Sequence, residues 1–310
     1  MTETNTQDLT FRWNDLELAG TLHCPDASDP HPAVLMMQGS GPADRDSNGY
    51  FPPIREAFLQ RGIATFAFDK PGIGESTGDW RDHGFDDRAG QALAALDLMR
   101  DHPSIDGERV GIWGHSQGGW LAQILAARLP DLHFAIANSG PSINPQFQDK
   151  YGCEHTMRAE GHSEEEIEQA LVFLDAVHDA ARRGDDYETV QADLLHDARQ
   201  HSWYGYLTLE DAETWSFIAR SAAERYEPVK ALSRIRCPFL AIYGAQDLLV
   251  PAWQSARESS DALHKSGNSD ATIVVFPQGD HRIRDAATDD FATGYLDLLG
   301  DWTARRAGST

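Results

Sequence analysis

Gly114-His115-Ser116-Gln117-Gly118 is the stretch that decides the fold of this chain, because of what lies on either side of it. The apolar run before it, residues 110–113, is typical of a short buried strand, and residues 119–129 have the length and the apolar stripe of a helix. A Gly-x-Ser-x-Gly turn between a strand and a helix predicts a nucleophile elbow, in which the serine is strained and exposed at the C-terminal edge of a parallel sheet. We therefore predict that Ser116 is a nucleophile; the alternative is a purely structural turn.

Expected strands and helices alternate along most of the chain. A hairpin is expected over residues 9–25. Further strands are expected over 33–37, 63–68, 133–137, 238–243 and 271–276, and helices over 54–60, 87–100, 252–265 and 291–304. This alternation predicts an α/β fold with a doubly wound, mostly parallel sheet.

An acid-rich segment of helical pattern, residues 145–226, interrupts the alternation. We expect it to form a helical cap, and residues 1–144 and 227–310 to form the core domain. Open α/β sheets bind ligands beyond the C-terminal ends of their strands, so such a cap would cover the site as a lid. Most aromatic rings of the segment are expected to pack in a small core of its own. Trp203 and Tyr204 are the two that we predict to contact a substrate.

A serine hydroxyl needs a base to remove its proton and a carboxylate to orient that base. The chain has 13 histidines, and their positions select among them. His281 follows the expected strand 271–276, and Asp247 follows the strand before it. The chain order Ser116, Asp247, His281 is typical of one fold, and chymotrypsin-like and subtilisin-like enzymes use other orders. His115 is expected to pack beside the elbow and to border the substrate, and not to act as the base.

The charge that develops on a carbonyl oxygen during acyl transfer requires hydrogen-bond donors. One donor is expected to be the backbone N–H of Gln117, directly after the nucleophile. The other is expected from the loop after strand 33–37, where the N–H of Ser40 is the candidate. Gly39 and Gly41 on either side let the backbone approach the substrate, and we count them as substrate-binding residues. The alternative is that this loop is only a turn.

These motifs together resemble the α/β-hydrolase family over nearly the whole chain. The matching segments are the loop 38–42, Asp69–Ser76, the elbow at Ser116, Gly244–Pro251 and Gly279–His281. Segments 14–22 and 39–46 look like those of bacterial acyl-esterases and of the related serine aminopeptidase-like hydrolases. The resemblance implies a serine hydrolase and leaves the substrate open. Gln38 is a departure, because many relatives carry histidine there; we expect only a supporting hydrogen bond to change.

The charge of the chain excludes several kinds of partner. Its 310 residues carry a net charge of −23, so neither nucleic acid nor an anionic membrane is expected to bind. Abundant carboxylates and few lysines are typical of salt-adapted proteins, and equally of acidic enzymes from GC-rich genomes. Residues 1–8 lack the basic and apolar parts of a secretory signal, and no stretch approaches the ~20 apolar residues of a membrane helix, so a cytoplasmic location is expected.

Neither a metal nor a cofactor is expected. The three cysteines are far apart and are expected to be free thiols. No group of histidine, cysteine and carboxylate residues has metal-ligand spacing. The segment Gly72-Ile73-Gly74 lacks the third glycine and the downstream acidic residue of a dinucleotide site.

The sequence predicts a serine carboxylesterase whose substrate is a small to medium acyl ester. A thioesterase and a peptidase of the same fold remain alternatives, as does a ligand-binding protein built on a hydrolase scaffold. A peptidase needs a carboxylate near the pocket to hold the substrate's amino group. The insertion offers as candidates Glu164, Glu165, Glu166, Asp185 and Asp186, although a solvated helix face also explains such charges. The oligomeric state is open, with a homodimer among the options.

Overall fold

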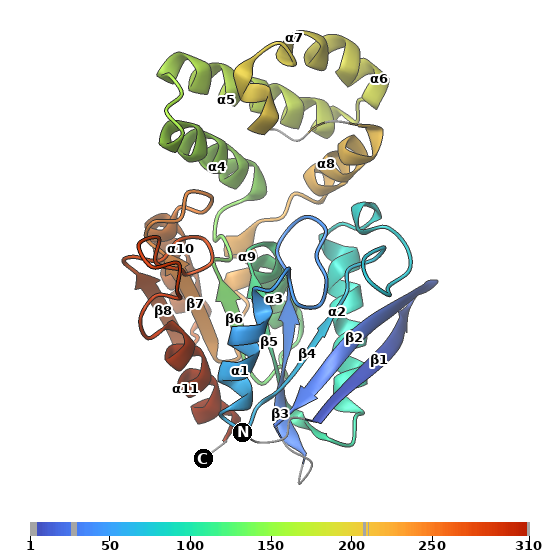
Figure 1. Ribbon diagram of the computed structural model, residues 1–310, viewed down its shortest axis with the longest axis vertical. Coiled ribbons are helices and arrows are strands. Elements are labelled where there is room, and N and C mark those ends of the chain that lie inside the picture. Colours follow the sequence, from blue (N-terminus) through green and yellow to red (C-terminus); the bar gives the residue numbers. More distant parts are fainter. Residues whose placement is uncertain (1–4, 26–29, 207–208, 210, 309–310) are drawn as a thin grey trace.

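The computed structural model describes residues 5–25, 30–206, 209 and 211–308, and its core is an eight-stranded sheet with helices on both faces (Figure 1). Along the sheet the strands follow the order β1-β2-β4-β3-β5-β6-β7-β8. β1 and β2 form an antiparallel hairpin, β2 pairs antiparallel with β4, and from β4 to β8 all neighbours are parallel. The strands are β1 (Asn5–Trp13), β2 (Leu16–Cys24), β3 (His31–Met37), β4 (Ala64–Phe68), β5 (Ile105–His115), β6 (Ala135–Asn138), β7 (Phe239–Gly244) and β8 (Ala271–Phe276).

Two apolar layers lie on opposite faces of this sheet. Because the central strands are buried on both sides, they read in the sequence as unbroken apolar runs; every residue of β3 and β7 is buried. One layer packs under α1 and α11, and the other under α2, α3 and α10. The helices of the core are α1 (Phe51–Leu59), α2 (Phe85–Arg100), α3 (Gln117–Arg128), α9 (Pro228–Leu232), α10 (Ala252–Ser266) and α11 (Tyr295–Ala307).

The predicted doubly wound, mostly parallel sheet is confirmed, with two differences in the helices. α9 was not expected, because its five residues are too few to show a helical period; Pro228 begins it. α11 begins four residues later than expected, because the segment that carries His281 continues through isolated bridges as far as Phe291. Within the described part of the chain, none of the helices has the length and apolar character needed to cross a membrane.

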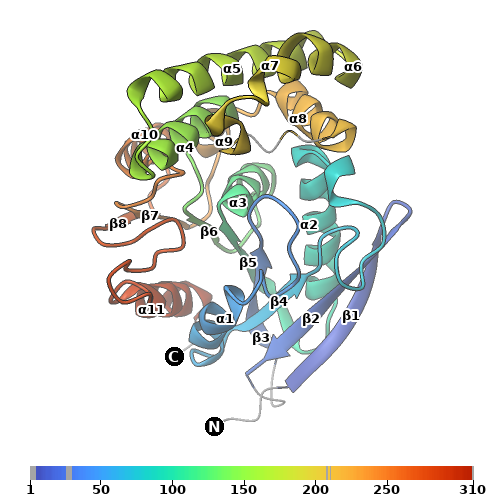
Figure 2. The ribbon, with the colours of Figure 1, turned by 45° about the horizontal axis from the view of Figure 1, so that its top comes forward.

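Residues 145–206 and 211–224 form a second layer of helices that lies over the C-terminal ends of the parallel strands (Figures 1 and 2). This cap has its own apolar core. Its longest helix starts at a capping box between Ser163 and Glu166 and ends at Gly184 in the left-handed conformation. The cap helices are α4 (Pro145–Ala159), α5 (Glu164–Arg183), α6 (Tyr187–Val190), α7 (His196–Ala198) and α8 (Ala212–Glu224).

Candidate active site

The turn at Ser116 joins β5 to α3 in a conformation that few residues adopt. Ser116 has φ 56° and ψ −116°, and its N–H donates to Asn138 O at 2.9 Å. A Cβ on Gly114 would lie 2.0 Å from Gly118 O, and a Cβ on Gly118 would lie 2.4 Å from Met37 O. Both glycines are therefore required for the backbone to turn this tightly beneath the serine.

Asp247 and His281 lie together beyond the ends of β7 and β8. His281 Nδ1 lies 2.8 Å from Asp247 Oδ2. The other carboxylate oxygen accepts the N–H groups of Leu249 at 2.8 Å and Val250 at 3.0 Å, and Asp247 is buried. With both carboxylate oxygens engaged as acceptors, a proton on Nδ1 of His281 is stabilised and Nε2 is left without it.

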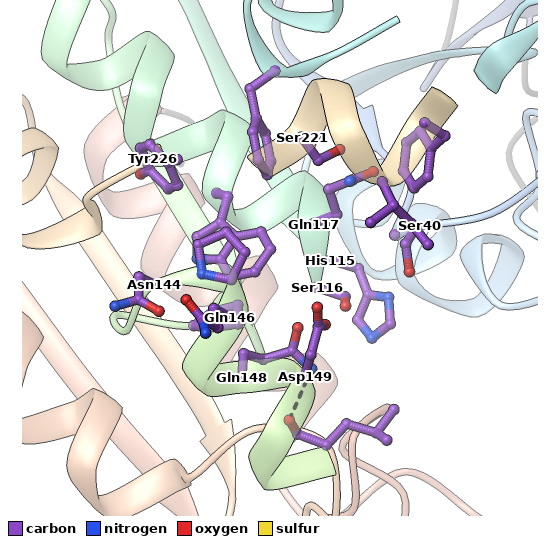
Figure 3. A pocket seen from close by; sticks show the side chains of 18 of the residues that line it. Ser40, His115, Ser116, Gln117, Asn144, Gln146, Gln148, Asp149, Ser221 and Tyr226 are labelled. Atoms are coloured by element: carbon purple, nitrogen blue, oxygen red, sulfur yellow. Dashed lines mark hydrogen bonds between the residues drawn. The ribbon is translucent and has the colours of Figure 1, made fainter. Parts of the chain in front are cut away.

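Ser116 and His281 line the same pocket, which opens beneath the cap. Figure 3 shows Ser116 between His115 and Gln117, facing the side chains of α4. In the part of the chain that the structure describes, no hydrogen bond joins Ser116 Oγ to the His281 ring. Hydrogen bonds between a nucleophile and its base often shorten only when a substrate is bound. The geometry of Ser116 and His281 without a substrate is therefore compatible with such a pair.

His115 supports the loop that carries His281. Its Nε2 lies 3.0 Å from His281 O, and its ring centroid lies 4.9 Å from the His281 ring and 4.8 Å from Tyr50. Burial, together with the neighbouring His281, holds the pKa of His115 well below 6.5. The neutral ring therefore donates its Nε2–H to the carbonyl. His115 also lines the pocket, so it has both the packing and the bordering positions expected of it.

The loop after β3 touches the elbow, as an oxyanion loop would. A Cβ on Gly39 would lie 3.2 Å from Ser116 Cβ, and Gly39, Ser40 and Gln117 all line the pocket. Gly41 does not belong to the described lining, so its contact with a substrate stays a prediction. It has φ 77°, a conformation that favours glycine where the loop turns.

Two side chains tie this loop to the end of β4. Gln38 Nε2 donates to Phe68 O at 2.6 Å and to Asp44 O at 3.0 Å, which is the supporting role expected of it. Lys70 Nζ donates to the carbonyl oxygens of Gly39 and of Gly41, the latter at 2.7 Å. Lys70 was not predicted from the sequence. The available signal was a lysine, one of only four in the chain, directly after a buried strand.

Arg88 of α2 holds the side chain of Gln117, the other residue expected to stabilise the oxyanion. Its Nη1 donates to Gln117 Oε1, its Nε to His83 O at 3.2 Å and its Nη2 to Trp80 O at 3.3 Å. Arg88 and Gln117 are both buried. A buried guanidinium with such partners fixes the orientation of a planar amide, so Gln117 is held from its side chain as well as by the helix that it begins.

The pocket has a volume of about 780 Å³ and two chemically different walls. One wall is aromatic: the ring centroids of Phe85, Trp120 and Tyr226 lie 5.3 to 6.1 Å apart. The other wall comes from the start of the cap and is polar; Figure 3 shows its side chains on and before α4. The polar residues that line it are Asn144, Gln146, Gln148, Asp149, His178 and Arg182.

Trp203 and Tyr204 belong to the core of the cap and lie outside the described lining of the pocket, so the structure does not bring these two predicted substrate-binding residues to the site. Trp203 is 3% exposed, packs in the cap core and donates its Nε1–H to Gln169 Oε1 at 3.3 Å. Tyr204 packs against the same cluster and donates to Leu209 O. The cap aromatic residue that reaches the pocket is Phe217 of α8.

None of the carboxylates suggested for binding an amino group lies on the described wall of the pocket. Glu164 pairs with Arg158, and Asp185 pairs with Arg183. Glu165 and Glu166 belong to the first turn of α5, and Asp186 caps the N-terminus of α6. The cap carboxylate on the pocket wall is Asp149 of α4, 3.3 Å from His178 Nε2. Among the described residues, no three or more His, Cys, Asp and Glu side chains are grouped to hold a metal ion.

Two family profiles match this chain, and each covers more than half of it. The profile described as "BAAT / Acyl-CoA thioester hydrolase C terminal" matches residues 93–286, and the profile "Esterase FrsA-like" matches residues 1–157. The two matches overlap across β5, the elbow and α3. Together they cover the core strands and most of the cap.

Individual proteins agree with these profiles. The chain is 34% identical over 116 residues to a 2,6-dihydropseudooxynicotine hydrolase of Paenarthrobacter nicotinovorans (37% of this chain, 30% of the relative). It is 31% identical over 140 residues to the esterase FrsA of Yersinia pestis (44% and 32%). These matches thus span about a third of each relative. A solved esterase of Pyrococcus furiosus superimposes with a TM-score of 0.64 at 18% identity (98% of this chain, 90% of that one). The chain belongs to the α/β-hydrolase superfamily, as an esterase-like hydrolase.

Proposed function

We propose that this protein is a serine carboxylesterase that cleaves small to medium acyl esters through an acyl-enzyme on Ser116. The observation that carries the proposal is the 2.8 Å contact between His281 Nδ1 and Asp247 Oδ2. His281 lines the same pocket as Ser116, whose backbone is strained. A buried carboxylate that orients a histidine beside such a serine matches the requirements of nucleophilic acyl transfer.

In the proposed mechanism, Ser116 Oγ attacks the ester carbonyl while His281 Nε2 takes its proton. Asp247 keeps His281 in the correct tautomer and stabilises the imidazolium that forms. The N–H groups of Gln117 and Ser40 stabilise the oxyanion. The protonated histidine then gives its proton to the leaving alcohol. A water molecule, activated by the same histidine, hydrolyses the acyl-enzyme and regenerates Ser116.

The two walls of the pocket support an assignment of the two ends of the substrate. The aromatic wall of Phe85, Trp120 and Tyr226 adjoins Gln117, and it suits an apolar acyl or aryl group. The polar wall on the cap suits an alcohol portion that can hydrogen-bond. A volume of about 780 Å³ accommodates both portions of a medium-sized ester.

A second candidate is an aminopeptidase-like hydrolase, and Asp149 is the observation that favours it. Its side chain is 50% exposed and lies on the pocket wall, where a carboxylate could hold the ammonium group of an aminoacyl substrate. His178 also faces this carboxylate, so the wall is not purely acidic. One of the two matching family profiles is named for acyl-CoA thioester hydrolases, so a thioester is the third substrate type to assay.

The proposal is tested with p-nitrophenyl esters of increasing acyl length, aminoacyl p-nitroanilides and an acyl thioester. We expect ester turnover by the wild type, no measurable turnover of the anilides, and loss of most ester turnover in Ser116→Ala. Ser260→Ala, which removes an exposed hydroxyl on α10, is the matched control and should retain full activity.

Three outcomes would redirect the proposal. Ester turnover that survives in Ser116→Ala contradicts the serine mechanism. Anilide turnover comparable to ester turnover, abolished in Asp149→Asn, favours the aminopeptidase. Turnover of the thioester alone assigns the enzyme to thioester hydrolysis.

A further inference from the structure

Two buried basic side chains lie behind the expected oxyanion donors. Lys70 follows β4 and Arg88 belongs to α2, and each is 6% exposed. Both line a small cavity beside Met37 and Leu121, and neither belongs to the described lining of the substrate pocket. Lys70 contacts the expected oxyanion loop from outside the described pocket lining, whereas Arg88 also lies over the ring of Phe217 on the pocket wall, 5.7 Å from its centroid.

Lys70 determines the direction of the peptide between Gly39 and Ser40. Its Nζ donates to Gly39 O, which is the carbonyl of that peptide. In a trans peptide the C=O and the N–H point in opposite directions. A carbonyl turned toward Lys70 therefore turns the N–H of Ser40 away from it, toward the pocket. Gly39 packs against Ser116 on that side.

The loop has little else to hold this peptide in place. Gly41, with φ 77°, and the exposed Ser40 are outside the sheet ladder. Gln38 ties the base of the loop to β4, and Ala43 O accepts the N–H of Lys70 at 3.3 Å. The tip is held by the second Lys70 bond, to Gly41 O at 2.7 Å. One side-chain nitrogen thus fixes the carbonyl oxygens on both sides of Ser40.

We propose that Lys70 is a positioning residue for catalysis, which holds the N–H of Ser40 in the direction that stabilises the oxyanion. This inference rests on the proposed function. Lys70 does not touch the substrate, so its effect should appear in the stabilisation of the transition state and not in the binding of the ground state.

The second donor gives an internal comparison. The N–H of Gln117 is fixed by the elbow itself, because Ser116 N donates to Asn138 O at 2.9 Å and Gly119 N donates to Ser116 O at 2.8 Å. Arg88 donates to the side-chain amide of Gln117. Loss of Lys70 should therefore reduce catalysis more than loss of Arg88.

The test compares Lys70→Met, Lys70→Arg and Arg88→Met with the wild type on a p-nitrophenyl ester. Complete loss of one oxyanion donor costs about 10² to 10³ in kcat. We expect Lys70→Met to lose about 10- to 100-fold in kcat, with KM within about threefold, since the N–H remains but is no longer aimed. Lys70→Arg should recover part of this loss, because a guanidinium can donate to both carbonyl oxygens.

A second readout separates positioning from general damage. An alkyl trifluoromethyl ketone forms a tetrahedral adduct and needs the oxyanion donors, whereas the matching alkyl methyl ketone resembles the ground state. We expect Lys70→Met to bind the trifluoromethyl ketone more weakly by about the same factor as its loss in kcat, and to bind the methyl ketone unchanged. Lys230→Met, which replaces an exposed lysine of α9, should change neither affinity.

Unchanged kcat in Lys70→Met, or a lower kcat with unchanged trifluoromethyl ketone affinity, overturns the inference. If Lys70→Met does not fold, Lys70→Gln is judged by the same two readouts. Ser116→Ala distinguishes the two proposals: if it abolishes turnover while Lys70→Met does not reduce kcat, only the role of Lys70 fails. Turnover that survives in Ser116→Ala removes the proposed function and this inference together.

Discussion

The edge of the sheet and the cap both contribute to the pocket, but they place their side chains by different means. At the edge, Ser116, Asp247 and His281 follow the ends of parallel strands, so the backbone brings them to one place. In the cap, Phe217 faces the pocket and Trp203 faces the cap core, and this difference depends on the direction in which each side chain leaves its helix or turn. The backbone of the core therefore brings these three side chains together, whereas the lining of the pocket depends on the side-chain packing of the cap and of the core helices α2 and α3.

His281→Ala should produce the largest effect, because it removes the base on the sheet edge. We expect kcat for a p-nitrophenyl ester to fall by about 10⁴-fold or more, with KM changed far less. Steady-state kinetics on variant and wild type measure it. A loss of less than about tenfold would show that another group acts as the base.

Asp69→Asn tests how much the ion pair between Arg45 and the buried Asp69, which follows β4, contributes to the stability of the fold. Arg45 Nη2 lies 2.6 Å from Asp69 Oδ2, and Asp69 is buried. Burial favours the neutral acid, but the hydrogen bonds from Arg45 and from the N–H of Glu75 together outweigh it and hold the pKa of Asp69 below 3.8. Removing the charge from such a pair should lower the free energy of unfolding by about 2 to 4 kcal/mol at pH 7.

The sign of the pH dependence follows from the lowered pKa of Asp69. Its stabilising contribution is complete above the pKa of the unfolded chain and is lost as the pH falls through the lower, folded value. The difference in unfolding free energy between wild type and Asp69→Asn should therefore shrink below about pH 4. Urea unfolding at several pH values measures it, and a difference that grows toward acid pH would contradict this account.

Phe217→Ala tests the cap wall of the pocket. Removing this ring should change kcat/KM by about tenfold for long or aryl acyl groups, since a ring's burial is worth ~1.5–3 kcal/mol and only part of it is given to the substrate. Short acyl esters should change much less. The measurement is the ratio of kcat/KM values across the acyl series, and a uniform loss at every length would mean that the ring acts on the chemistry and not on selection.

Trp203→Phe is the matched variant in the cap core and should have the smallest effect on activity. The smaller ring should lower stability by about 1 kcal/mol or somewhat more, while the acyl-length profile stays within about twofold of the wild type. Thermal unfolding and the same ester series measure both quantities. A profile shifted like that of Phe217→Ala would show that the cap core and the pocket wall are not separate.

The same contrast explains what could be predicted from the sequence. Asp247 and His281 were found because each follows an apolar strand, and parallel topology brings strand ends to one edge. Trp203 and Tyr204 were predicted at the pocket but pack in the cap core, because a helical pattern shows that a face is apolar without showing what that face covers. Lys70 was missed for a related reason: its partners are carbonyl oxygens of a loop, which carry no signature in the side-chain sequence.

The most direct test of the central claim is covalent labelling with an alkyl fluorophosphonate, followed by peptide mass mapping and measurement of residual esterase activity. The account predicts one adduct per chain, on the peptide that carries Ser116, with activity lost in proportion to labelling. Ser116→Ala should remain unlabelled. An adduct on another residue, or full activity in a protein labelled at Ser116, would contradict the serine mechanism.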